Sequence, residues 1–194
     1  MKKHLAGYIY IVSNPSMEGL IKIGHASDVK SRIHQLNKVI EVPTPFQLEF
    51  EQFSHDVRQV VLLIHSELYD ARVDIMRPYF SVEVGKAVEI AKNMIHKVEE
   101  NPLYFQALFP ENDQKWDEKT AVQVVSLYKK VPDIKFVSSI IGRSFMEVEL
   151  FLNYIGVLHT TEFSKFIPYF KGIPRNCYQE GTFDKLVNKV MVKV

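Results

Sequence analysis

The chain has 194 residues, of which 46% are hydrophobic and 24% are charged, and its formal net charge is +1. These values are ordinary for a globular protein and exclude a disordered chain, while the small net charge gives no overall attraction to a polyanion. The single cysteine, Cys177, excludes an internal disulfide and a cysteine-based zinc cluster. No apolar run reaches the ~20 residues of a membrane helix, so we expect a cytoplasmic protein with no membrane contact.

Two short segments near the N-terminus predict a β-hairpin. Residues 7–12 alternate tyrosine with isoleucine, which places Tyr8 and Tyr10 on one face of a strand. A turn rich in Ser, Asn, Pro and Gly follows, and residues 21–23 form the returning strand. The basic start of the chain is therefore expected to lead into a strand and not into a signal peptide.

The rest of residues 1–100 shows alternating helical and strand patterns. They predict a helix over 29–36 capped by Asp28, a strand over 46–53, a buried helix over 57–68, a short strand over 79–82 and a helix over 83–98. Residues 1–100 are thus predicted to form an α+β domain, in which helices flank a small three-stranded antiparallel sheet.

The remainder of the chain has a different sequence pattern. Residues 101–114 are polar and carry prolines, which predicts a linker. Residues 115–194 are predicted to form a mostly α-helical domain, with helices over 120–130, 134–141 and 144–154. Gly142 allows a tight turn between the last two of these helices, which favours a helix-turn-helix-like arrangement that binds DNA or protein.

Basic residues gather in this C-terminal domain. Residues 115–194 carry 12 Lys/Arg and 8 Asp/Glu, a balance of +4. A backbone-binding patch is predicted from Lys129, Lys130, Lys135, Arg143, Lys165, Lys171 and Arg175. However, the expected recognition helix offers Glu147 and Glu149, which a polyanion would repel. A protein partner or a homodimer contact is therefore favoured over docking in the major groove.

Several motifs of the first domain share one order and spacing. They are the hairpin of residues 7–24, Arg32, the segment 43–46, His65, Arg72-Val73 and Tyr79-Phe80. Together, over about residues 7–82, they resemble the GIY-YIG nuclease superfamily, in its phage-type branch that carries a lysine in place of the second tyrosine. This resemblance implies a phosphodiester-cleaving fold that binds nucleic acid, with DNA the favoured substrate.

The resemblance also implies roles for five residues. Tyr10 would take part in proton transfer at the attacking oxygen, and Tyr8 is a second candidate for this role. Lys22 stands in the place of the second tyrosine and would contact phosphate. Arg32 would stabilise the negative charge that grows on the phosphoryl oxygens, and His25 occupies a position that is often basic.

The metal half of such a site departs from the family pattern. The family glutamate lies one helical turn before the helix histidine, and from His65 this position is Val61. A second acidic position, before Tyr79, is Pro78. The sequence therefore predicts no metal ligand at Val61 and a nucleic-acid-binding protein whose metal-dependent cleavage is lost or weakened.

Two alternatives remain open. The chain is an active endonuclease if another carboxylate, such as Glu49 or Glu51, holds the Mg²⁺ or Mn²⁺ ion that this chemistry uses. The second alternative is a protein-interaction module without a nucleic-acid role, which the near-zero net charge allows.

Overall fold

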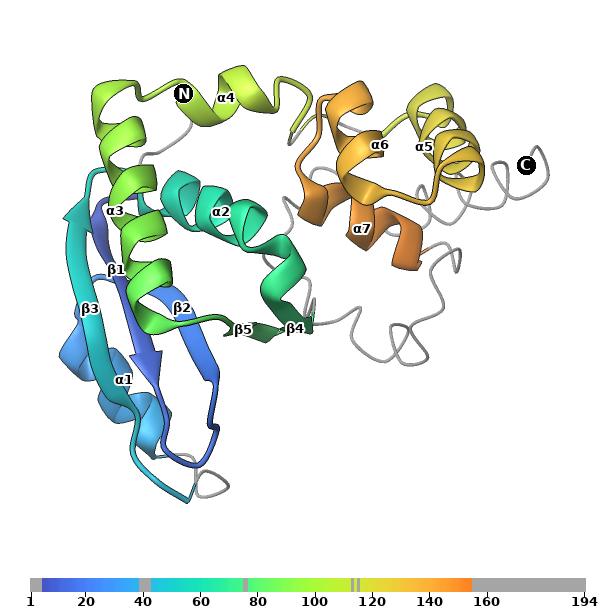
Figure 1. Cartoon of the computed structure of the whole chain (residues 1–194). Coiled ribbons are helices and arrows are strands. Elements are labelled where there is room, and N and C mark those ends of the chain that lie inside the picture. The colour runs from blue at the N-terminus through green and yellow to red at the C-terminus, as the bar shows by residue number, and fades with distance from the viewer. Residues whose placement is uncertain (1–4, 39–42, 75–76, 113, 115, 155–194) are drawn as a thin grey trace. The chain divides into compact units, whose positions relative to one another are not determined.

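The computed structural model describes residues 5–38, 43–74, 77–112, 114 and 116–154. The chain divides into two compact units, with the boundary between Phe105 and Gln106. Each unit is built around its own elements (Figure 1). Within the described residues, no helix is long and apolar enough to cross a membrane.

The first unit is built on an antiparallel sheet. Its strands are β1 (Gly7–Ser13), β2 (Leu20–Ala26), β3 (Gln47–Ser54), β4 (Arg72–Asp74) and β5 (Arg77–Ser81). Their order across the sheet is β3-β1-β2-β5-β4. The prediction of three strands was therefore wrong, because the described residues form a five-stranded sheet. The sequence indicated a strand near Tyr79, but nothing local indicated that it pairs with β2, almost 60 residues earlier.

Helices cover both faces of this sheet (Figure 1). The predicted Asp28 cap is confirmed, since its carboxylate accepts a hydrogen bond from the Ser31 amide and α1 spans Val29–Asn37. This helix packs on the face that carries Tyr10. The helices α2 (Val57–Glu67) and α3 (Val84–Glu100) pack on the other face. A 3-10 turn, η1 (Tyr69–Ala71), leads from α2 into β4.

The outer edge of β2 is only partly paired. The β5 strand pairs with β2 over Leu20–Lys22, and no described strand continues this pairing along residues 23–26. The helix α1 follows directly after this stretch. The end of β2 therefore borders an opening next to α1, which positions the candidate site.

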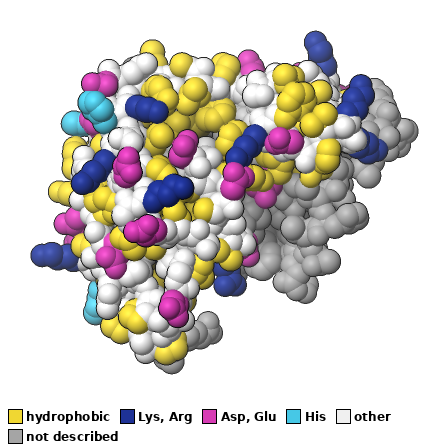
Figure 2. Space-filling view, viewed as in Figure 1, with side chains coloured by type: hydrophobic (Ala, Val, Ile, Leu, Met, Phe, Trp, Pro, Cys, Tyr) yellow, Lys and Arg dark blue, Asp and Glu magenta, His cyan; other side chains and the backbone are white. Residues whose placement is uncertain are grey.

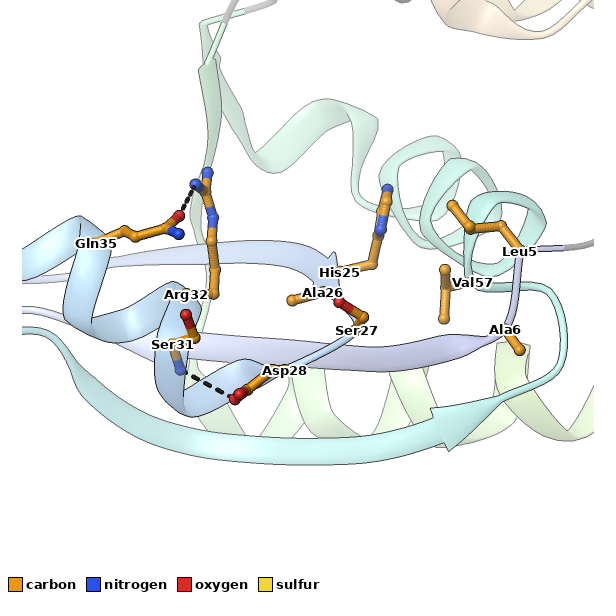
Figure 3. Close-up of a pocket in the computed structure, with 10 residues that line it drawn as sticks. All are labelled: Leu5, Ala6, His25, Ala26, Ser27, Asp28, Ser31, Arg32, Gln35 and Val57. Carbon is orange, nitrogen blue, oxygen red and sulfur yellow. Dashed lines mark hydrogen bonds between the residues drawn. The ribbon is translucent and has the colours of Figure 1, made fainter.

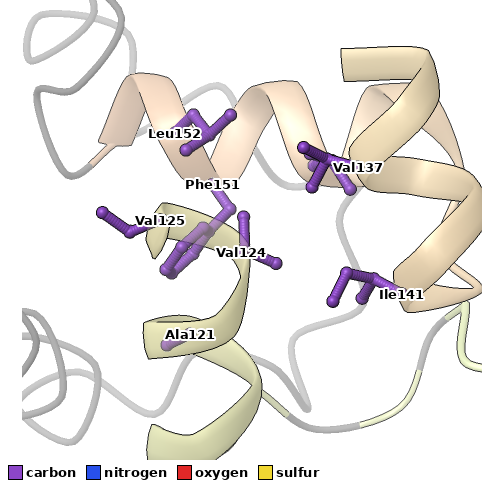
Figure 4. Close-up of a cluster of buried hydrophobic side chains, with 8 residues drawn as sticks. Ala121, Val124, Val125, Val137, Ile141, Phe151 and Leu152 are labelled. Carbon is purple, nitrogen blue, oxygen red and sulfur yellow. The ribbon is translucent and has the colours of Figure 1, made fainter. Parts of the chain in front are cut away.

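The described part of the second unit is helical. After α4 (Tyr104–Leu108), which lies at the boundary, come α5 (Glu118–Lys130), α6 (Ile134–Ile141) and α7 (Phe145–Tyr154). Gly142 ends α6 in the left-handed conformation, with φ of 73°, as a tight turn requires. The core of this unit is formed by Ala121, Val124, Val125, Val137, Ile141, Val148, Phe151 and Leu152 (Figure 4).

Candidate nucleic-acid interface

Tyr10 and Gly24 form the centre of the site. They are opposite each other in the pairing of β1 with β2. A Cβ atom added to Gly24 would lie 2.7 Å from the Tyr10 hydroxyl oxygen and 2.8 Å from its Cζ atom, so the phenol ring lies directly over the glycine. The Tyr10 side chain is only 2% exposed and packs with Val12, Val29 and Phe46. The ring is therefore fixed in one place by packing.

Lys22 lies on the same face of the sheet as Tyr10. It is opposite Val12 in the β1–β2 register, and paired residues share a face. Its ammonium nitrogen lies 4.8 Å from the centroid of the Tyr79 ring, a cation–π contact, and its side chain is buried. Burial, and then the nearby Arg32 charge, lower the pKa of Lys22 to about 8. An anion close to Lys22 would therefore stabilise the charged form of this side chain.

Tyr79 is a member of the site to which the sequence analysis assigned no role. It is opposite Lys22 in the β2–β5 register and packs against the cluster that contains Tyr10. Burial raises the pKa of the Tyr79 hydroxyl, and the nearby Tyr10 adds to this while Arg77 opposes it. The aromatic pair Tyr79-Phe80 belongs to the resemblance, but nothing in its local sequence indicates that Tyr79 contacts Lys22.

Arg32 and His25 lie beside an open pocket of about 430 Å³ at the end of β2. Figure 3 shows their side chains projecting in the same direction. Arg32 donates a hydrogen bond of 3.3 Å from Nη1 to the side-chain oxygen of Gln35, which is neutral, so this contact leaves its positive charge uncompensated. Desolvation lowers the pKa of His25, and the charges of Arg32 and Arg58 add to this effect, so His25 is neutral at pH 7.

Tyr8 shares the face of Tyr10 but has other neighbours. Its side chain is 38% exposed, and its ring makes an edge-to-face contact with Phe53, with centroids 5.6 Å apart. The strand β3, which carries Phe53, lies on the far side of β1 from β2. The structure therefore brings Tyr10, Lys22, Tyr79 and Arg32 together on the β2 side of β1, whereas Tyr8 lies toward β3.

The helix α2 carries His65 and, one turn before it, Val61, at the position where the resemblance implies a glutamate. His65 is buried, with Nε2 3.4 Å from the carbonyl oxygen of Ile23 and its ring 5.0 Å from that of Phe80. Burial is the main cause that lowers the pKa of His65 to about 3, and Arg72 adds to it. Val61 lies one turn earlier on the same helix and is half-buried.

The described residues offer no cluster of metal-ligating side chains. No group of three or more His, Cys, Asp or Glu side chains among them is arranged to hold a metal ion. Glu51 is opposite Tyr10 in the β1–β3 register, but β1 separates it from Lys22 on β2, about 10 Å away by strand spacing. Glu49 accepts a hydrogen bond of 2.5 Å from the Ser13 hydroxyl. We therefore derive no catalytic step that uses a metal.

The basic residues predicted for the second unit fall into three groups. Lys129, Lys130 and Lys135 are exposed on α5 and α6. Arg143 is 1% exposed: it donates hydrogen bonds to a Glu147 carboxylate oxygen at 2.8 Å and to a backbone carbonyl, and it stacks on Trp116. Its guanidinium is therefore part of the core and does not face solvent. Lys165, Lys171 and Arg175 lie outside the described residues.

The comparisons with known proteins give one result. Residues 7–95 match the T5orf172 domain, a phage-associated family that is GIY-YIG-like. No curated protein and no solved structure matches the chain. The matched range contains every candidate site residue of the first unit and ends within α3.

Proposed function

We propose that this chain is a cytoplasmic nucleic-acid-binding protein of the phage-type GIY-YIG branch, and that its first unit binds a backbone phosphate with Lys22 and Arg32. The observation that carries the proposal is that Lys22 is buried on the sheet face that carries Tyr10 and against the Tyr79 ring. Burial, and then the nearby Arg32 charge, lower the pKa of this lysine. Two cations held close together repel each other, and a bound phosphate would relieve this repulsion. The T5orf172 match at residues 7–95 supports a nucleic-acid role.

The two cations suit different parts of one phosphate. The guanidinium of Arg32 offers a planar fork of donors to two oxygens, while the Lys22 ammonium offers a compact charge. The Tyr79 ring stands beside the Lys22 ammonium and packs against the cluster that contains Tyr10, so aromatic surface covers part of this lysine. Local geometry must carry the affinity, because the formal net charge of the chain is only +1. On the face shown in Figure 2, basic and acidic side chains are likewise interspersed.

We propose further that metal-dependent cleavage is lost or weakened in this chain. The supporting observation is the half-buried Val61 on α2, at the position where the resemblance implies a glutamate. The second unit would act as a helix-turn-helix-like module. Its role is to contact DNA backbone through Lys129, Lys130 and Lys135, or to bind a protein partner or a second copy of the chain.

The binding proposal is tested by titration of a fluorescent DNA oligonucleotide at several salt concentrations. We expect Arg32→Ala to weaken binding roughly tenfold, as for a lost charged hydrogen bond, and to reduce the slope of log affinity against log salt by about 1. Lys30→Ala is the matched control, because Lys30 is exposed on the same helix and does not line the pocket. Equal losses in both variants would refute a specific phosphate site at Arg32.

The proposal on cleavage is tested with DNA and Mg²⁺ or Mn²⁺. The natural chain should leave the DNA intact, whereas Val61→Glu should gain cleavage that disappears again in Val61→Glu/Arg32→Ala. Val61→Gln is the control, since it has a similar size but no charge. Cleavage by the natural chain that is abolished by Arg32→Ala would favour the second candidate, an active endonuclease, for which Glu51 beside Tyr10 in the sheet register is the carboxylate to test.

A further inference from the structure

The pocket at the end of β2 has walls of two kinds. Its lining includes the apolar residues Leu5, Ala6 and Val57 and the polar residues His25, Asp28 and Arg32. In Figure 3 the apolar side chains of Leu5, Ala6 and Val57 lie at one end, and the Gln35 amide lies at the other. The volume of about 430 Å³ is within the range of small-molecule sites, roughly 300–1,000 Å³.

The polar wall offers both donors and acceptors. The guanidinium of Arg32 donates, and the neutral ring of His25 has one nitrogen that donates and one that accepts. The Asp28 carboxylate accepts a hydrogen bond from the Ser31 amide at Oδ1, and its second oxygen is able to accept one from a ligand. An apolar wall beside such a mixed polar wall suits a flat heterocycle with donors and acceptors along its edge.

The pocket adjoins the proposed phosphate site, because Arg32 lines the pocket and lies close enough to Lys22 for its charge to act on this lysine. A group that enters the pocket is therefore attached next to a phosphate held by Arg32 and Lys22. We propose that the pocket takes an unpaired nucleobase, the one carried by the nucleotide whose phosphate these two cations bind. This inference rests on the proposed function and adds the substrate class: single-stranded nucleic acid, or a duplex with a base turned out of its stack.

Pairing decides which nucleic acid fits. In an intact duplex each base is stacked and paired on the inside, away from its own phosphate, so it cannot enter a pocket beside that phosphate. A single strand meets no such cost, whereas extrusion of a base from a duplex costs unstacking and unpairing energy. The protein should therefore prefer single strands to duplexes of the same sequence.

The test has two independent parts: phenylalanine variants fill the pocket of the protein, and abasic probes remove the base from the DNA. Binding of three fluorescent probes is measured by anisotropy: a single-stranded DNA, the same strand with all bases replaced by abasic sites, and the duplex. We expect the natural chain to bind the single strand roughly tenfold more tightly than the abasic strand. Ser31→Phe and Ser27→Phe, which place a ring in the pocket at two exposed positions, should remove this preference and leave binding of the abasic strand within twofold.

His34→Phe is the matched control, because His34 is exposed on the same helix and does not line the pocket. It should keep the preference for bases, and circular dichroism should show that all three variants are folded. An RNA strand of the same sequence tests whether the base is taken from DNA or from RNA. Tighter binding of base-containing than of abasic strands, with either sugar, supports the inference.

Abasic and normal strands bound equally by the natural chain, both in an Arg32-dependent way, would overturn the base pocket and leave the phosphate site in place. Equal or tighter binding of the duplex would also overturn it. No binding of any probe at low salt would overturn both the pocket and the proposed function.

Discussion

The phenol ring of Tyr10 lies directly over Gly24, so the glycine is the only residue that leaves room for it. The two residues are neighbours across β1 and β2, and the ring is almost fully buried. The tyrosine and the glycine therefore act as one packed pair.

Gly24→Ala is expected to destabilise the first unit by about 1–3 kcal/mol, because the new methyl group would overlap the Tyr10 ring and force a shift in a packed sheet. Gly85→Ala is the matched control. The nearest atom to its added Cβ would be 3.7 Å away, and alanine favours the helix α3 by up to ~1 kcal/mol. Urea unfolding of both variants measures the difference. A Gly24→Ala protein as stable as the natural chain would contradict the geometry.

The affinity for DNA is expected to fall as pH rises through about 8. Lys22 has a pKa of about 8 in the free protein, so it is charged and binds phosphate below this pH and is neutral above it. Bound phosphate favours the charged form and moves the fall to higher pH. In Lys22→Arg the guanidinium stays charged, so affinity should be flat between pH 7 and pH 9. Titrations across this range test it, and identical pH profiles would exclude Lys22 as a phosphate ligand.

His65→Leu is expected to make the first unit less sensitive to acid. The pKa of His65 is about 3 in the folded chain against 6.5 as its ordinary value, so between these pH values the unfolded chain binds more protons. The stability of the natural chain therefore falls as pH decreases, by up to about 1.4 kcal/mol per pH unit from this residue.

Urea unfolding at pH 7 and at pH 4.5 measures this effect. The difference in stability between the two pH values should be smaller in His65→Leu than in the natural chain. His34→Leu removes an exposed histidine and should keep the natural difference. A His65→Leu protein with an unchanged pH dependence would show that His65 takes up its proton in the folded state.

Arg143→Ala is expected to destabilise the second unit by about 3–5 kcal/mol, because it leaves the nearly buried Glu147 carboxylate without this cation. Lys130→Ala, at an exposed position of α5, should change stability by less than about 0.5 kcal/mol. Fluorescence of Trp116, the one tryptophan of the chain, reports unfolding of this unit. If Arg143→Ala/Glu147→Ala were no more stable than Arg143→Ala, the ion pair would not be the cause.

The sequence predicted local elements well and long-range relations poorly. Alternation and the Asp28 cap located β1, β2 and α1 to within a few residues, because strand period and capping are local properties. The β2–β5 pairing, which brings Tyr79 to Lys22, depends on segments far apart in the chain and has no local signal.

The burial of Arg143 was missed for a different reason. The spacing of four to Glu147 on a helix was a signal for an ion pair, but the glutamate was interpreted as a group that repels DNA. The Val61 substitution, in contrast, was readable from the sequence, because the expected glutamate has a fixed spacing from His65.

The buried pair of Tyr10 and Gly24 has a consequence for how relatives of this chain should be interpreted. A domain that never hydrolyses a phosphodiester still needs the Tyr10 ring, and the absence of a side chain at Gly24, for its packing, so selection for stability alone would preserve both residues. A tyrosine and a glycine at these two positions therefore indicate a shared fold. Nuclease activity should instead be assigned from the residue at the position of Val61 on α2, where stability does not require a carboxylate.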